Sequence, residues 1–189
     1  MTTANPTDPA EVRLTGENSF IRLTEGNDQT TRTSHWRVLL SPVGPGHVLF
    51  LKSELVDGIR IYADNLALAR WLQNEIESML FEEFANPSIP VVDAEFSKKG
   101  DTFSYWTESI ESDEDNITLT WHDFLEPYML VQPVGPDRPK GVYSCFTPAR
   151  AARITVNGDE AAGEVTLIKR GDRDSSNACL AWSETWLWP

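Results

Sequence analysis

The sequence is poor in the residues that hold disulfides and metal ions. It has two cysteines and three histidines in 189 residues. Two cysteines are too few for a disulfide framework, and no two histidines stand at the helical spacing of a metal-binding pair. Glycine-rich phosphate-binding loops are also absent from the sequence. We therefore expect reduced thiols, no bound metal ion and no cofactor.

Positive charge is scarce as well. Sixteen lysines and arginines face 29 aspartates and glutamates, which gives a net charge of −13 at pH 7. A surface of this sign does not neutralise phosphates, so neither nucleic acid nor an anionic membrane is an expected partner. No run approaches the ~20 apolar residues of a membrane-spanning helix. The first ten residues lack the basic start and apolar stretch of a signal peptide. These features predict a cytoplasmic protein.

The sequence does contain one helical pattern among many alternating segments. Apolar residues recur every three or four positions and predict one long amphipathic helix at about 64–85, with Asp64 as its N-cap. About ten other segments alternate with period two between turn signals. We predict a mainly β fold: a single-domain antiparallel barrel, or a strongly curved sheet or sandwich, of about 8–10 strands. The helix is expected to cover one end or face. Residues 1–10 are expected to form a flexible tail and 11–189 the domain. The apolar stripe of the helix consists of Leu68, Trp71, Leu72, Ile76, Met79, Leu80 and Phe84.

Two turn signals predict hairpins outside the helix. Gly16, followed by Glu17 and Asn18, interrupts the alternation of residues 12–24. Asn157-Gly158 follows a β-branched strand and is the strongest short-range hairpin signal in the chain. The expected return strand of the second hairpin is 164–169.

The segment 117–124 carries the first candidate for chemistry. Alternation places Trp121 on one face, and Thr120 and His122 on the other. An imidazole titrates near neutrality and can move a proton, so His122 is the expected acid–base residue if its face lines a cavity. Thr120 and Trp121 are expected to contact a ligand there. The alternative is an exposed polar face with an idle histidine.

The segment 102–110 carries the second candidate. Trp106 and Glu108 share one face, and Tyr105 lies on the other. Desolvation raises the pKa of a carboxyl group beside a tryptophan on an inward face, so Glu108 is a second acid–base candidate. Trp106 and Tyr105 are expected ligand contacts. The alternative is that Glu108 is a rim or surface residue.

The acidic run 111–116 predicts a hairpin tip between these two segments. Counting back from the tip pairs Glu108 with Leu119, which puts Glu108 and His122 on opposite faces. A slip by one residue would place them on the same face. The sequence leaves both registers open.

The C-terminal segment carries the third candidate. Aromatic walls around one carboxylate are typical of a small-molecule pocket, so Glu184 is an acid–base candidate and Trp182 and Trp186 are expected ligand contacts. Tyr143, in the apolar segment 142–146, is a further expected contact. The same face can instead be core, the seam against the helix, or an oligomer interface. Its residues are Leu180, Trp182, Glu184, Trp186 and Trp188.

These patterns predict a cofactor-independent enzyme that acts on a small apolar or aromatic molecule in a barrel cavity. General acid–base chemistry suits a hydrolase, a lyase or hydratase, or an isomerase. One alternative is a non-catalytic protein that binds a small hydrophobic ligand. Another is a homo-oligomeric interaction protein whose tryptophan-rich last strand forms the interface.

Overall fold

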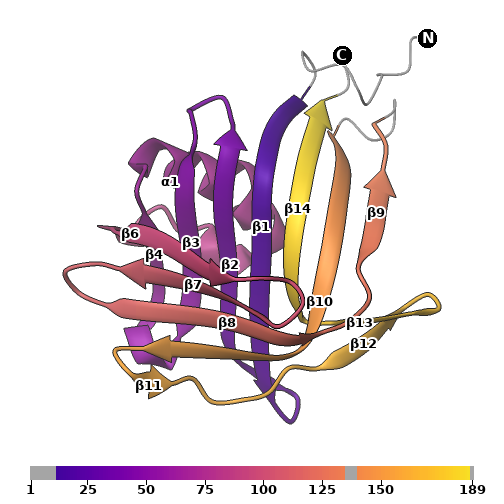
Figure 1. Cartoon of the computed structure of the whole chain (residues 1–189). Helices are drawn as coiled ribbons and strands as arrows, with labels where there is room; N and C mark the ends of the chain where they lie inside the picture. The colour runs from indigo at the N-terminus through magenta and orange to yellow at the C-terminus, as the bar shows by residue number, and fades with distance from the viewer. Residues whose placement is uncertain (1–11, 135–139, 188–189) are drawn as a thin grey trace.

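The computed structural model describes residues 12–134 and 140–187, which form one strongly bent β-sheet, a separate two-stranded hairpin and a helix (Figure 1). The content is 64% strand and 12% helix, and the sheet nearly closes on itself. This confirms the mainly β, barrel-like fold with one helix. The tail expected at residues 1–10 and Trp188 lie outside the described residues.

The sheet bends at β10 (Lys140–Val156) into two half-sheets that share this strand. Lys140 to Pro148 pair with β14, whereas Ala149 to Val156 pair with β8. Proline has no N–H to offer a sheet, and Pro148 lies at the point where the partner changes. In order, the first half-sheet contains β5 (Val91–Asp93), β4 (Gly58–Ala63), β3 (Gly46–Ser53), β2 (Asp28–Leu40), β1 (Val12–Glu25), β14 (Ala178–Leu187), β10 and β9 (Tyr128–Gln132). The second contains β11 (Asp159–Glu160), β10, β8 (Asn116–Phe124), β7 (Tyr105–Glu111) and β6 (Glu95–Gly100).

The described strand pairs are antiparallel except for β4 with β5. A separate hairpin joins β12 (Leu167–Arg170) to β13 (Arg173–Ser176). Figure 1 shows the second half-sheet crossing the lower and middle part of the first. The upper parts of β14, β10 and β9 therefore lack this cover on their inner face, which is the face turned toward the second half-sheet.

Apolar side chains fill the space between the half-sheets. Trp121 of β8 is fully buried there, and its indole N–H donates a hydrogen bond to the carbonyl of Phe20 at 3.1 Å. These side chains occupy the interior that the sequence-based prediction assigned to a ligand cavity. The main members of this core are Ile21, Leu23, Leu49, Leu51, Tyr62, Ile110, Ile117, Leu119, Trp121, Ile154 and Val156.

The helix lies on the opposite, outer face of the first half-sheet. It runs from Leu66 to Leu80 as α1 (Leu66–Leu72), the π-turn η2 (Gln73–Glu77) and α2 (Ser78–Leu80). Leu68 and Leu72 pack with residues of β3 and β4 in a second apolar cluster. The first half-sheet is therefore buried on both faces at its centre. No helix in the described part of the chain is long and apolar enough to span a bilayer.

The helix differs from its prediction at both ends. Asn65, and not Asp64, is the N-cap, because its side chain accepts the backbone N–H of Leu68 at 3.1 Å. The helix stops at Leu80, since Phe81 is extended, and a short 3-10 turn η3 (Glu82–Phe84) follows. A further 3-10 turn, η1 (Glu54–Val56), joins β3 to β4.

The π-turn also changes which side chains the helix buries. Its extra residue rotates the following turn relative to a regular helix. Glu77 is therefore fully buried, whereas Met79 and Leu80 of the expected apolar stripe are 64% and 58% exposed.

The two turn signals have different outcomes. Gly16 lies inside the continuous strand β1, so the hairpin within residues 12–24 is wrong. A Cβ atom at this position would overlap the carbonyl oxygen of Arg37, and the pairing of β1 with β2 shifts beside it. Glycine here permits a close backbone approach at a bulge. The Asn157-Gly158 turn is confirmed, but its return strand is Asp159–Glu160 and not 164–169.

Candidate functional site

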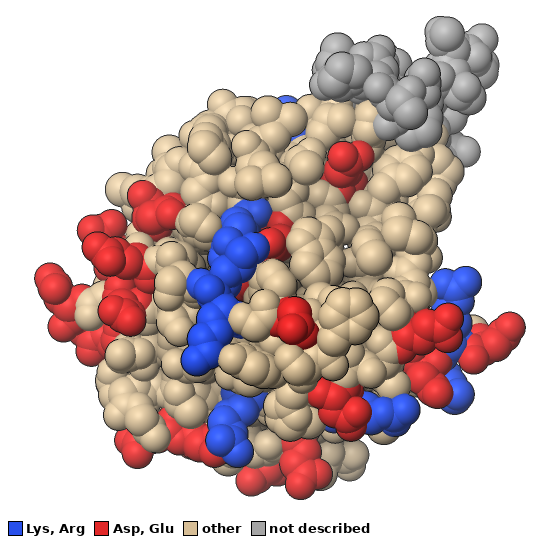
Figure 2. Space-filling view, viewed as in Figure 1, with Lys and Arg blue, Asp and Glu red and all other residues tan. Residues whose placement is uncertain are grey.

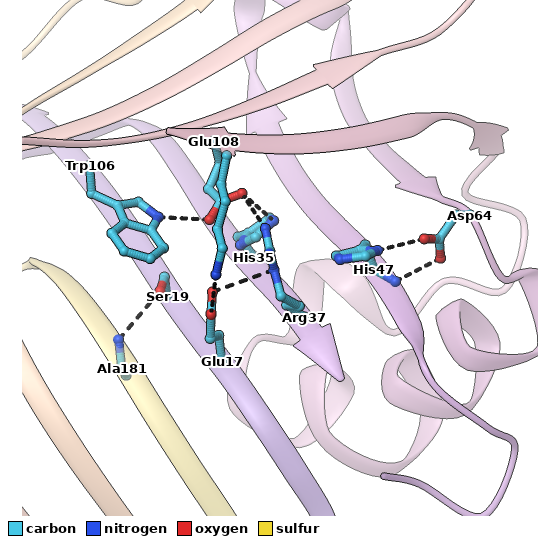
Figure 3. Close-up of polar contacts among 10 residues, drawn as sticks. Glu17, Ser19, His35, Arg37, His47, Asp64, Trp106, Glu108 and Ala181 are labelled. Atoms are coloured by element: carbon cyan, nitrogen blue, oxygen red, sulfur yellow. Dashed lines mark hydrogen bonds and ion pairs between the residues drawn. The ribbon is translucent and has the colours of Figure 1, made fainter. Parts of the chain in front are cut away.

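A cluster of charged side chains lies between the half-sheets, at the edge of their apolar core (Figure 3). Cross-strand pairing of Glu17 with Arg37 aligns β1 and β2, so these side chains share the inner face. Glu108 of β7 approaches them from the second half-sheet. We call the following set the polar cluster: Glu17, His35, Arg37, Lys98, Trp106 and Glu108.

Glu108 is the central residue of the polar cluster and is 1% exposed. One carboxylate oxygen accepts the indole N–H of Trp106 at 2.7 Å, and the other accepts Nη2 of Arg37 at 3.0 Å. Burial raises the pKa of Glu108 to about 7, although the Trp106 hydrogen bond and the Arg37 charge both oppose the increase. The direction of this shift is the one that desolvation beside a tryptophan favours. A carboxyl group with this pKa is suited to proton transfer near neutral pH.

His35 lies beside Glu108 and is fully buried. Its Nε2 is 3.9 Å from a carboxylate oxygen of Glu108, and neither ring nitrogen has a hydrogen-bond partner among the described residues. Burial lowers the pKa of His35 to about 3, and the positive charge of Arg37 adds to the effect. The imidazole is therefore neutral at physiological pH. In this pair the carboxyl group, and not the imidazole, changes its charge near neutrality.

A second histidine lies one strand further along the same inner face. His47 pairs with Asp64 through its ring and its backbone N–H (Figure 3). Phe96 lies between the two histidines, with ring centroids 5.2 Å from His47 and 6.0 Å from His35. Across residues 12–134 and 140–187, no group of three His, Cys, Asp or Glu side chains is arranged to hold a metal ion.

Arg37, Glu17 and Lys98 connect the two half-sheets. Nε of Arg37 is 3.6 Å from one carboxylate oxygen of Glu17, and Nζ of Lys98 is 3.2 Å from the other. Lys98 also lies over the ring of Trp106 at 4.8 Å. Arg37 thus contacts two carboxyl groups, those of Glu17 and Glu108, at the point where β6 and β7 meet β1 and β2.

A depression of about 390 Å³ opens on the uncovered inner face next to the polar cluster. The ring of Trp182 forms part of the depression and meets the ring of Trp106 edge-on, with the ring centroids 6.0 Å apart. This contact connects the depression to the polar cluster. Figure 2 shows few charged side chains where β14 and β10 face the viewer. We call this the aromatic depression; it is lined by Thr15, Gly16, Glu17, Arg37, Leu39, Met129, Tyr143, Cys145, Trp182, Ser183 and Glu184. Two larger surface depressions share no residue with the polar cluster.

Several residues singled out from the sequence meet at this place. Trp106 and Glu108 belong to the polar cluster, and Tyr143, Trp182 and Glu184 line the aromatic depression. They meet because Tyr143 of β10 pairs directly with Glu184 of β14. Trp186 follows Glu184 on the same face of β14 and is buried, with its ring 6.1 Å from that of Tyr143.

The remaining predicted residues lie elsewhere. Glu108 pairs with Leu119, so the register counted from the acidic tip is confirmed and His122 lies on the opposite face. His122 is exposed and pairs with Tyr105, which is also exposed, on the outer face of the second half-sheet. Thr120 shares this face, where its hydroxyl meets that of Thr107 at 3.2 Å. Trp121 belongs to the apolar core.

Sequence reasoning missed Glu17, His35 and Arg37. Glu17 falls within the stretch interpreted as a turn. His35 and Arg37 alternate with the apolar residues Trp36 and Val38, a pattern that usually marks a solvent-facing side of a strand. The helix packs on the apolar side, and the second half-sheet covers the polar one. In comparisons with protein-family models, curated protein sequences and solved structures, no match to the chain was found.

Proposed function

We propose that this protein binds a small, largely apolar or aromatic molecule in the aromatic depression. The observation that carries the proposal is the depression itself, about 390 Å³ in volume, with rings of Tyr143 and Trp182 in its lining and the polar cluster at its edge. Small-molecule sites are typically about 300–1,000 Å³ and combine apolar walls with a few polar groups.

The polar groups of the depression suit a ligand that also carries a hydrogen-bonding group. Glu184 is half-buried, and within the described part of the chain its side-chain carboxylate has no hydrogen-bond or ion-pair partner. Arg37, by contrast, is already shared by two carboxylates. Glu184 is therefore the group best placed to orient a ligand whose apolar body packs on Tyr143 and Trp182.

The proposal is tested by NMR titration with small neutral aromatic alcohols, beginning with 2-phenylethanol. We expect chemical-shift changes at Tyr143 and Trp182, and affinity at least about fivefold weaker in Tyr143→Ala, because an aromatic contact contributes about 1 kcal/mol beyond its buried area. Tyr105→Ala is the matched control, since Tyr105 lies on the outer face of the second half-sheet. Absence of shifts at Tyr143 and Trp182 with every probe would contradict the proposal, as would equal losses in both variants.

A second candidate function is general acid–base catalysis on the bound molecule. It is favoured by Glu108, whose pKa of about 7 suits proton transfer at neutral pH. Arg37 lines the depression and contacts Glu108 at 3.0 Å. Because Glu108 is 1% exposed, its direct contact with a ligand requires the Arg37 side chain to move aside. Isomerisation, hydration and elimination each need one such group.

Catalysis is tested by mass spectrometry of small molecules after incubation with the protein. Where a molecule is converted, Glu108→Gln is expected to lower turnover at least about 100-fold, because positioned acid–base groups contribute about 10²–10⁴-fold. His122→Ala should leave turnover unchanged, and the pH profile should inflect near the pKa of Glu108. Unchanged turnover in Glu108→Gln would rule out this role. Ligands recovered unaltered would leave binding as the function.

A further inference from the structure

A second hollow lies on the other face of the first half-sheet, beside the helix. It has a volume of about 380 Å³ and shares only Ser183 with the aromatic depression. We call it the helix groove. Its apolar lining comes from both the helix and the sheet and includes Trp36, Trp71, Ile76, Met79, Val142 and Phe146.

The groove exists because the helix is too short to cover the half-sheet. The main contacts of α1 with strands lie on β3, β4 and β5, so α1 leaves the described parts of the outer faces of β14 and β10 uncovered. Val142 and Phe146 of β10 point to this outer face. The π-turn adds to the apolar surface, because it directs Met79 outward, where that side chain is 64% exposed.

Positive charge gathers at one end of the helix groove. Arg13 and Lys140 approach the same carboxylate, that of Glu75, at 3.8 and 3.5 Å. Arg13 also lies over the ring of Trp71 at 5.5 Å. All three charged residues line the groove, and together they carry one excess positive charge. This excess contrasts with the net charge of −13 of the whole chain.

We infer that the helix groove binds a single-chain amphipathic anion, that is, an alkyl chain that ends in a carboxylate. The chain packs between Trp36, Trp71 and Phe146, where each buried methylene contributes about 0.8 kcal/mol. The carboxylate lies between Arg13 and Lys140 and completes the neutralisation that Glu75 begins. This site is independent of the aromatic depression and of its proposed ligand.

The test compares three ten-carbon probes below their micellar concentrations: decanoate, decanol and decyltrimethylammonium. Calorimetry on the full chain at low ionic strength should show decanoate binding at least about tenfold more tightly than decyltrimethylammonium. The double variant Arg13→Gln/Lys140→Gln should lose this preference but still bind decanol. Preference for the cation, or no saturable binding of decanoate, would overturn the inference.

A matched pair of variants locates the site. Met79→Glu places a negative charge in the helix groove and should weaken decanoate binding at least about tenfold. Met129→Glu makes the same change in the aromatic depression, at a side chain that is 54% exposed. Met129→Glu should weaken the binding of 2-phenylethanol and leave the affinity for decanoate unchanged. The inference fails if decanoate responds to Met129→Glu and not to Met79→Glu, whichever way 2-phenylethanol behaves.

Discussion

Glu108→Gln is expected to change how stability depends on pH. The folded carboxyl group keeps its proton up to a pKa of about 7, whereas the ordinary pKa is 4.5. Between these values the folded state binds more protons than the unfolded state, so the free energy of unfolding falls as pH rises. Because of this group alone, the free energy of unfolding of the wild-type protein should fall by about 3 kcal/mol relative to that of Glu108→Gln as pH rises from 4.5 to about 7.

His35 acts with the opposite sign. Its pKa falls from 6.5 to about 3 on folding. Its contribution to stability is therefore fully present above pH 6.5 and is lost as the pH decreases toward the pKa of the folded state. The full loss amounts to about 5 kcal/mol. Between pH 4.5 and pH 6.5, the ordinary pKa values of Glu108 and His35, Glu108 makes stability fall with pH and His35 makes it rise by the same amount. The two effects therefore cancel in the wild-type protein. Only single variants reveal them.

The measurement is urea unfolding of wild type, Glu108→Gln and His35→Leu over this pH range, with each variant subtracted from wild type. The subtraction removes the pH dependence that comes from the many other carboxylates. A difference in stability that does not change with pH then reports packing alone. We expect stability to increase with pH in Glu108→Gln and to decrease with pH in His35→Leu. Curves parallel to the wild type would show that neither pKa is shifted on folding.

Arg37→Leu is expected to produce the second large effect. At about pH 8 the substitution removes the counter-charge of the ionised Glu108, which then regains its proton; because pH 8 is only one unit above its pKa of about 7, the pH-dependent part of the cost is at most about 1.4 kcal/mol. Glu17 keeps Lys98, which is 3.2 Å away. At about pH 5 Glu108 is protonated, so this part of the cost should disappear. Urea unfolding at the two pH values gives the difference directly.

Two further variants separate charge from packing at Arg37. Arg37→Lys keeps the positive charge and should retain part of the stability at about pH 8, although it loses the forked geometry of the guanidinium. Adding Glu108→Gln to Arg37→Leu removes the titrating group and should restore this part of the stability at high pH. An equal cost at both pH values, without recovery in the double variant, would indicate that Arg37 acts only through packing.

Local pattern was sufficient for much of the fold. Alternation and turn chemistry predicted the strands, and the acidic tip predicted the register that pairs Glu108 with Leu119. The helix was also predictable, but its π-turn was not. Spacing alone does not show where one extra residue enters a turn, so the burial of Glu77 and the exposure of Met79 were unexpected.

The candidate site was only half predictable for a topological reason. A carboxyl group beside a tryptophan is a local feature, and it identified Glu108. Which side of β8 faces the core depends on the bend at Pro148, which brings β8 and β7 over β1 and β2. That long-range arrangement buries His35 and leaves His122 exposed. No sequence pattern within residues 31–38 or 117–124 indicates this arrangement.

The central claim is that burial beside the aromatic depression gives Glu108 a proton affinity suited to neutral pH. The most direct test is the carboxyl ¹³C chemical shift of Glu108 across pH, assigned by its disappearance in Glu108→Gln. We predict a midpoint at a pKa of about 7. A midpoint at the ordinary value of 4.5 would contradict the account.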